Sequence, residues 1–247
     1  MATYNFKKIK GKKVIEWNKG RLRGITESKE RIGDITLLIK KQLKEKRKIR
    51  VLEVGCGYCR ALMELKKLFG DKIETHGINL EKRWDVKLAR RYGLKHKIFT
   101  KKEIDKNLPK IYILDAGKKL PFKSGSYDFI FSQASVQYIH DKALFLEEVN
   151  RLLSKNGTAI IELQEYKPKH SIEYKNLFEI WHKDKIIRSM DYLKRFKNIK
   201  FKKYKWESHV LEIKKSKNFK LNLKLITSFD LNNINPTWWG TKAIYKK

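Results

Sequence analysis

The feature that most constrains the fold is a short apolar run that leads into two closely spaced glycines, residues 49–57. The run is rich in β-branched residues, carries the acid Glu53 and gives way to Gly55 and Gly57, so it predicts a buried strand that enters a tight turn. Such a turn lets a ligand lie against bare backbone, exposes the first amides of the next helix and offers a carboxylate. We therefore expect a cofactor cradle at residues 49–59.

The segments around this cradle alternate between helix and strand patterns. Apolar residues at three- and four-residue steps predict helices, whereas short β-branched or aromatic runs predict strands. The expected helices span 27–46, 62–69, 81–92 and 141–154, and the expected later strands span 73–80, 111–114, 127–132 and 158–163. This alternation requires parallel strands joined by right-handed crossovers, so the predicted class is α/β.

The pattern changes beyond residue 165. Residues 166–196 have helical spacing, residues 219–225 alternate as in a half-buried strand, and residues 241–245 predict a last strand. We therefore expect four parts: a basic N-terminal arm (1–26), the α/β core (27–165), a basic inserted cap (166–218) and C-terminal strands that complete the sheet (219–247).

The charge of the chain is strongly one-sided. Lys and Arg number 59 against 27 acids, a net charge of +32. Residues 194–224 hold twelve Lys and Arg against only Glu207 and Glu212. Charge of this size and concentration favours a polyanionic partner, for which nucleic acid is the first choice. A lysine-rich composition of the source organism is the alternative explanation.

Several other partners and sites are not expected. No apolar run approaches the roughly 18 residues of a membrane span, and the N-terminus lacks the apolar centre of a signal peptide, so we expect a cytoplasmic protein without a membrane partner. Cys56 and Cys59 form a Cys-x-x-Cys pair that resembles a redox motif, but their place inside the glycine turn argues against redox chemistry. Two cysteines alone cannot complete a structural zinc site, and no metal is expected.

Four motifs in order resemble those of the class I S-adenosylmethionine (SAM) dependent methyltransferases, over residues 49–165. They are Val51 to Gly57, Gly77 to Leu80, Leu114-Asp115-Ala116 with Leu120-Pro121-Phe122, and Tyr127 to Ser132 leading to Gly157-Thr158. The resemblance implies a Rossmann-like sheet of seven strands, mostly parallel, with helices on both faces and an antiparallel strand near the C-terminus. It also implies SAM as the cofactor.

The same resemblance assigns roles to residues at the ends of the strands. In the family's pattern, Glu53, Gly55 and Gly57 hold the methionine portion of SAM, with Cys59 at the third position of the glycine cradle. Asn79 and Leu80 lie at the ribose, Asp115 and Ala116 at the adenine amino edge, and Gln133 faces the methyl-bearing sulfur. All these positions follow strands, where open α/β sheets bind their ligands.

Two of these positions depart from the family's pattern. Asn79 stands where the family usually has an acid that bonds both ribose hydroxyls. We therefore expect the ribose to bind more weakly by about 1 kcal/mol, and Glu81 is a candidate to compensate for the missing acid. Cys59 replaces a common glycine and narrows the approach to the cofactor. Both departures leave open weak SAM binding, or a fold kept for binding without catalysis.

Residues that face the methyl acceptor must come from the loops after the fourth and fifth strands. Methyl transfer is an in-line displacement, so the enzyme aligns the nucleophile and, for some acceptors, removes a proton. Tyr138 and His140 are the candidates to face the substrate, and Glu165 is a candidate base. For His140 the alternative is an ordinary helix-capping or surface residue.

The sequence narrows the substrate without naming it. It has no Asn-Pro-Pro-aromatic tetrapeptide, which speaks against adenine-N6 methylation, and no cysteine placed for carbon-5 pyrimidine chemistry. Residues 133–138 resemble the corresponding loop of mRNA cap guanine-N7 methyltransferases and also that of quinone-biosynthesis methyltransferases. The basic charge favours RNA or an RNA-protein particle as substrate. A small-molecule methyltransferase and a non-catalytic RNA-binding or assembly protein are the alternatives.

Overall fold

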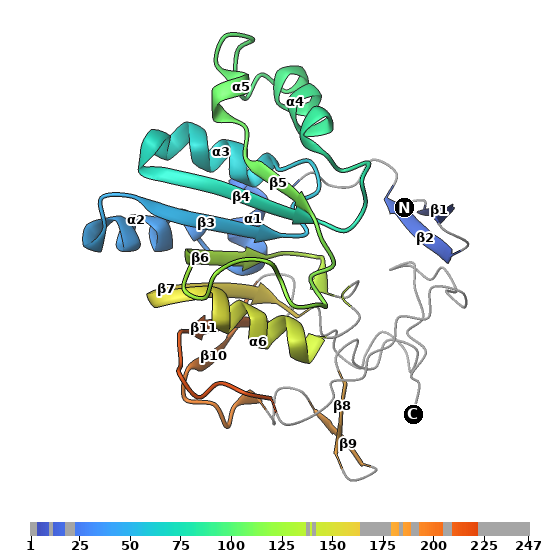
Figure 1. The fold of residues 1–247 in the computed structure, drawn as a ribbon, viewed down its shortest axis with the longest axis vertical. Coiled ribbons are helices and arrows are strands. Elements are labelled where there is room, and N and C mark those ends of the chain that lie inside the picture. The colour runs from blue at the N-terminus through green and yellow to red at the C-terminus, as the bar shows by residue number, and fades with distance from the viewer. Residues whose placement is uncertain are drawn as a thin grey trace.

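The computed structural model describes residues 4–9, 12–17, 23–136, 139, 142–163, 179–182, 185–188, 193–204 and 209–221. Their centre is a seven-stranded sheet in the order β10-β11-β7-β6-β3-β4-β5 (Figure 1). The strands are β3 (Ile49–Val54), β4 (Ile73–Asn79), β5 (Lys110–Ile113), β6 (Tyr127–Ser132), β7 (Leu153–Glu162), β10 (Ile199–Lys203) and β11 (His209–Lys214).

Among these seven strands, only β11 runs against the others. β3 to β7 pair in parallel, whereas β11 runs antiparallel to both β7 and β10. The expected Rossmann-like α/β fold with a mostly parallel sheet is confirmed.

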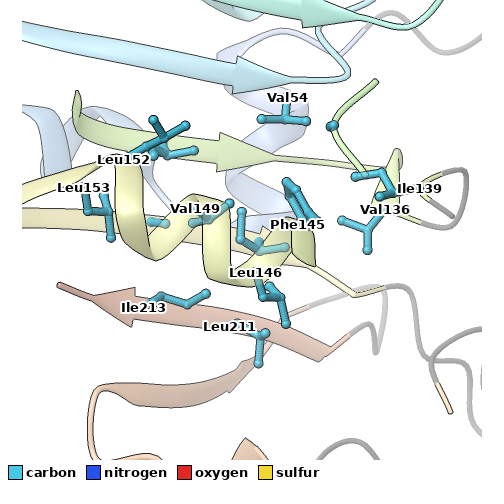
Figure 2. Close-up of a cluster of buried hydrophobic side chains, with 14 of the residues drawn as sticks. Val54, Val136, Ile139, Phe145, Leu146, Val149, Leu152, Leu153, Leu211 and Ile213 are labelled. Atoms are coloured by element: carbon cyan, nitrogen blue, oxygen red, sulfur yellow. The ribbon is translucent and has the colours of Figure 1, made fainter. Parts of the chain in front are cut away.

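Helices cover both faces of the sheet. One face packs against α1 (Ile25–Ile32), α2 (Ile35–Glu45) and α3 (Arg60–Phe69), and the other packs against α6 (Lys142–Leu152). Neighbouring strand residues point to opposite faces, so Val51 and Phe129 join the first core whereas Leu52 and Ile130 join the second. Figure 2 shows Phe145, Leu146 and Val149 of α6 among the side chains of this second core. Burial on both faces explains why these strands are nearly continuous apolar runs.

Three further helices lie on the β4 and β5 side. They are η1 (Gly70–Lys72), α4 (Val86–Lys95) and α5 (Ile104–Asn107). No helix in the described ranges is long and apolar enough to cross a membrane.

The helix expected over 27–46 is two helices. Gly33 adopts φ +90°, which breaks the first helix, and the Asp34 carboxylate accepts from the amides of Thr36 (3.0 Å) and Leu37 (3.2 Å), which starts the second. The apolar spacing continues across the break because both helices lie on the same face of the sheet.

The C-terminal expectations need correction. The strands that complete the sheet are β10 and β11, which lie inside the range expected to be the inserted cap, and residues 219–221 are irregular. β10 was missed because it offers only two apolar positions, Ile199 and Phe201, which are too few among lysines to distinguish a strand from a polar loop. Residues 222–247, including the expected strand 241–245, lie outside the described residues.

Two hairpins were also not expected. β8 (Glu179–His182) and β9 (Lys185–Arg188) pair antiparallel within a range expected to be helical, so that expectation is wrong for these residues. In the basic N-terminal arm, for which no strand was predicted, β1 (Tyr4–Ile9) pairs antiparallel with β2 (Lys12–Trp17). The division of the chain into four parts otherwise stays a prediction.

Candidate functional site

The cofactor residues predicted from the sequence meet at the carboxyl ends of the parallel strands. β6, β3, β4 and β5 are neighbours and run in the same direction, so the residues after each strand lie side by side. They are the turn 55–59 after β3, Asn79 at the end of β4, Asp115 after β5 and Gln133 after β6.

The glycine turn is built for close approach. Gly55 (φ +75°) and Gly57 (φ +52°) both occupy the left-handed region. A Cβ at Gly55 would stand closer than 3.0 Å to Ser135, so only glycine fits there. A Cβ at Gly57 would meet no atom within 4 Å, so the space in front of this glycine is open to a ligand.

Asn79 holds this turn in place. Its Oδ1 accepts from the amide of Gly57 (2.8 Å), and its Nδ2 donates to the carbonyls of Gly57 (3.1 Å) and Trp84 (2.8 Å). An acid could not make the two donated bonds, which gives the departure from the family's pattern a structural reason. One lone pair of Oδ1 stays available for a ribose hydroxyl.

Glu53 is the most perturbed acid of the site. Its side chain is buried, and burial raises its pKa to about 8, against the lowering effects of Gln133 and Arg23. Oε1 accepts from Gln133 Nε2 (3.4 Å), whereas Oε2 is buried and has no protein partner among the described residues. A buried carboxylate oxygen without a partner fits the ammonium group of SAM, which would supply both a donor and a compensating charge.

The adenine side of the site is more open. Asp115 Oδ1 accepts from the amide of Gly117 (2.9 Å), and its side chain is 38% exposed. Ala116 is buried, whereas Leu80 is 60% exposed at the predicted ribose position. An exposed apolar side chain at this place suits contact with a bound nucleoside.

Helix α1 contributes residues that the sequence patterns did not single out. Ser28 Oγ donates to Gln133 Oε1 (3.0 Å), and Arg31 forms a buried ion pair with Glu162 at the end of β7. Arg23, just before α1, acts electrostatically on Glu53. Ser28 and Arg31 contact partners 105 and 131 residues away, so no local pattern could have revealed them.

The cysteine pair is buried and reduced. Cys59 Sγ lies 3.3 Å from Cys56 Sγ, and burial raises the pKa of the Cys56 thiol. A neutral buried thiol is a poor nucleophile, in keeping with a packing role. The described residues contain no group of three metal-ligating side chains.

The three residues predicted to face the methyl acceptor are Tyr138, His140 and Glu165. All three lie outside the described residues, so their roles stay predictions.

Comparison with known proteins agrees with this architecture. Residues 52–161 match the family model described as a methyltransferase domain. The chain is similar in structure to a possible exported protein from Bordetella parapertussis (13% identity, 77% of this chain and 68% of that one, TM-score 0.50). It is also similar to a SAM-dependent methyltransferase from Aquifex aeolicus (19% identity, 75% and 92%, TM-score 0.46).

A third similar structure is a Galdieria sulphuraria protein assigned as a sarcosine dimethylglycine methyltransferase (18% identity, 55% of this chain, TM-score 0.42). The chain spans about half of that protein's length, 49%. These likenesses concern the fold, whereas the family match covers the glycine turn and the strand ends that carry the motifs. Over residues 52–161 the chain is therefore similar to methyltransferase domains that use SAM as their cofactor.

Proposed function

We propose that this methyltransferase acts on RNA, alone or within an RNA-protein particle. The observation that carries the proposal is the charge of the sheet edge formed by β10 and β11. Residues 193–204 contain six Lys and Arg, residues 209–221 contain four, and the only acid in these two ranges is Glu212. Such an edge suits a chain of phosphates.

Part of this charge is used inside the protein. Lys202 forms an ion pair with Glu212, and Lys215 Nζ donates to the carbonyls of Asn150 (2.7 Å) and Arg151 (3.0 Å) near the end of α6. Among the exposed lysines of these two ranges, four form no hydrogen bond or ion pair with the described residues, namely Lys197, Lys200, Lys217 and Lys220. We name these four the edge lysines, and they are the ones available to an external anion.

The position of the edge lysines argues for a long substrate. Lys197 precedes β10 and Lys217 follows β11, so both lie at the end of the sheet opposite the glycine turn. One strand of six residues already spans about 20 Å. A polynucleotide can reach from there to the site, whereas a small molecule cannot touch both. Exposed Lys82 and Lys118, after β4 and β5, add positive charge beside the site itself.

The site supplies the cofactor end of the reaction. SAM, when bound, provides an electrophilic methyl group on a positively charged sulfur. Glu53 would bind the ammonium group of SAM, and Gly57 would let SAM approach the backbone. Asn79 would hold the turn that contains Gly57. Because attack requires the acceptor in line with the sulfur, the protein's remaining task is to align that acceptor and exclude water.

The test is a transfer assay with tritiated SAM, offered total RNA and small-molecule extracts in parallel. We expect label in RNA. The four edge lysines are then changed to Gln, and a control carries Lys67, Lys72, Lys101 and Lys102 changed to Gln, which are exposed around α3 and α5 on the other half of the sheet. Both variants lose the same charge.

We expect the edge variant to lose RNA affinity, and its slope of log K against log salt to flatten by about 3 for single-stranded RNA. SAM affinity should stay unchanged in both variants. Label confined to the small-molecule fraction would overturn the proposal in favour of a small-molecule methyltransferase. Equal loss of RNA affinity in the two variants would show that the edge is not the binding surface.

A further inference from the structure

The turn that follows β6 is held by three different parts of the fold. Gln133 accepts from Ser28 of α1 (3.0 Å), and Ala134 N donates to Glu162 Oε2 at the end of β7 (2.7 Å). Ser135 Oγ donates to the carbonyl of Val54 at the end of β3 (2.9 Å). Three successive residues therefore have three separate anchors.

The middle residue of the turn is strained. Ala134 has φ +48°, in the left-handed region that residues with a Cβ avoid. A strained backbone persists only where its surroundings fix it, and such residues cluster at functional sites. One contact that fixes Ala134 is the bond from its amide to Glu162, whose side chain is fully buried.

Glu162 is itself fixed by Arg31. Nε of Arg31 donates to Oε2 of Glu162 (3.2 Å), and Nη2 pairs with Oε1, which makes a two-pronged ion pair. The Arg31 side chain is 10% exposed, so the pair is shielded from water. Two prongs define the plane of the carboxylate, and with it the direction from which Oε2 meets Ala134.

We propose that Arg31 and Glu162 are positioning residues for SAM binding, acting through the turn 133–135. The pair fixes Ala134, and Ala134 sets the direction of the neighbouring Gln133, whose Nε2 donates to Glu53 Oε1 (3.4 Å). Gln133 in turn keeps Glu53 Oε1 engaged and leaves Oε2 for the ammonium group of SAM. The proposal rests on the assignment of Gln133 and Glu53 to the SAM site, and it is independent of the methyl acceptor.

A matched control lies at the opposite end of the strands. Asp128, near the start of β6, is a buried carboxylate that pairs with Lys46 and accepts from the amide of Arg50 (2.9 Å). It thus combines an ion pair with a backbone N–H bond, as Glu162 does, but it lies away from the glycine turn. A purely structural effect should be the same at both acids.

The experiment compares Glu162→Gln with Asp128→Asn by thermal unfolding and by calorimetric titration with SAM. Gln keeps an acceptor for Ala134 but loses the charge and the two-pronged geometry. We expect both variants to melt at lower temperature, and only Glu162→Gln to raise the Kd for SAM, by about tenfold or more. Arg31→Lys, which keeps the charge and loses one prong, should give a smaller shift in the same direction and guards against a variant that fails to fold.

A double variant tests whether Glu162 affects SAM binding through Gln133 or by a general destabilisation of the fold. If Glu162 acts through Gln133, then Glu162→Gln combined with Gln133→Met should bind SAM no more weakly than Gln133→Met alone. Fully additive losses in SAM affinity, or an equal Kd shift in Asp128→Asn, would overturn the positioning role. If Gln133→Met leaves the Kd for SAM unchanged, the site assignment is wrong and the proposal falls with it.

Discussion

The side-chain amide of Asn79 holds both polar groups of Gly57, accepting from its N–H (2.8 Å) and donating to its carbonyl (3.1 Å). The amide thus works as a clamp on the glycine turn, across two neighbouring strands. A carboxylate at this place could accept from the N–H, but it would face the carbonyls of Gly57 and Trp84 without a hydrogen to offer.

Asn79→Asp should therefore destabilise the protein, although it restores the acid common in the family. Loss of two donated bonds in a buried place should cost about 2–3 kcal/mol in the free energy of unfolding, and the Kd for SAM should rise because the turn loosens. Urea unfolding and calorimetry measure the two effects. Asn107→Asp is the control, because Asn107 also donates to a carbonyl (2.9 Å) but does so in an exposed hydrogen bond. Tighter SAM binding by Asn79→Asp would contradict this account.

Glu53 should make the stability of the ligand-free protein depend on pH. Its pKa in the folded state is about 8, above the ordinary 4.5, so the folded protein keeps a proton that the unfolded chain releases. Stability is therefore full below about pH 4.5 and declines up to about pH 8, by roughly 1.4 kcal/mol per pH unit at most. Glu53→Gln should remove this contribution. Melting temperatures across pH 5 to 8.5 that decline equally in both proteins would contradict it.

SAM binding should lower the pKa of Glu53, whereas burial in the ligand-free protein raises it. The ammonium group of SAM favours the charged carboxylate, so binding should release a proton from Glu53 below pH 8. We expect the affinity to rise by up to about tenfold per pH unit between pH 6 and 8. Calorimetry in buffers of different ionisation enthalpy counts the released protons. Glu53→Gln should bind weakly, with no proton release.

Two glycines of the turn should respond differently to alanine. Gly55→Ala forces a Cβ against Ser135 and should cost stability through both overpacking and backbone strain, together about 2–5 kcal/mol. Gly57→Ala meets no protein atom and should cost only about 1–2 kcal/mol, but it should raise the Kd for SAM because the methyl group fills the ligand's space.

Gly70→Ala is the control for these two changes. It has nearly the same φ (+57°) and open space, but it lies at the far end of α3. Its ψ of −135° lies outside the left-handed α region, so Gly70→Ala should cost at least as much stability as Gly57→Ala, and it should leave SAM binding intact. Equal SAM affinity of the Gly57 and Gly70 variants would show that no ligand approaches Gly57.

The two cysteines should react slowly in the folded protein. Both are buried, and burial raises the pKa of the Cys56 thiol, so little thiolate is present near neutral pH. We expect two thiol equivalents to react with Ellman's reagent only on unfolding in urea. Rapid reaction of the native protein, or a disulfide found under mild oxidation, would reopen the redox interpretation.

The core of the sheet could be predicted because its signals are local. The strand expected at 127–132 is β6 to the residue, since a strand buried on both faces reads as a nearly continuous apolar run. β10 escaped prediction because its outward residues are lysines, so its apolar positions stand among residues typical of a solvated loop. The break between α1 and α2 at Gly33 could not be predicted, because the apolar residues of both helices pack into the same core and keep the helical spacing.

The candidate site could be predicted only for the residues that follow strands. Turn chemistry reveals Gly55 and Gly57 because both adopt a positive φ that favours glycine, and Glu53 stands close before them at the end of the strand. The anchoring residues Ser28, Arg31 and Glu162 are ordinary polar residues in their local context. Their partners come together only when the chain has folded, and one sequence carries no record of such long-range pairs.

Helix α1 carries two of these anchoring residues, Ser28 and Arg31, so they move together. Ser28 and Arg31 are three residues apart, so they share a face of the helix, and that face touches both Gln133 and Glu162. A sideways displacement of this one helix by an ångström would disturb both links together. By thermodynamic reciprocity, whatever tightens α1 raises the affinity for SAM, and SAM must tighten α1 to the same extent. On the proposed role of Arg31 and Glu162, a change in the position of α1 would therefore appear as a change in the Kd for SAM.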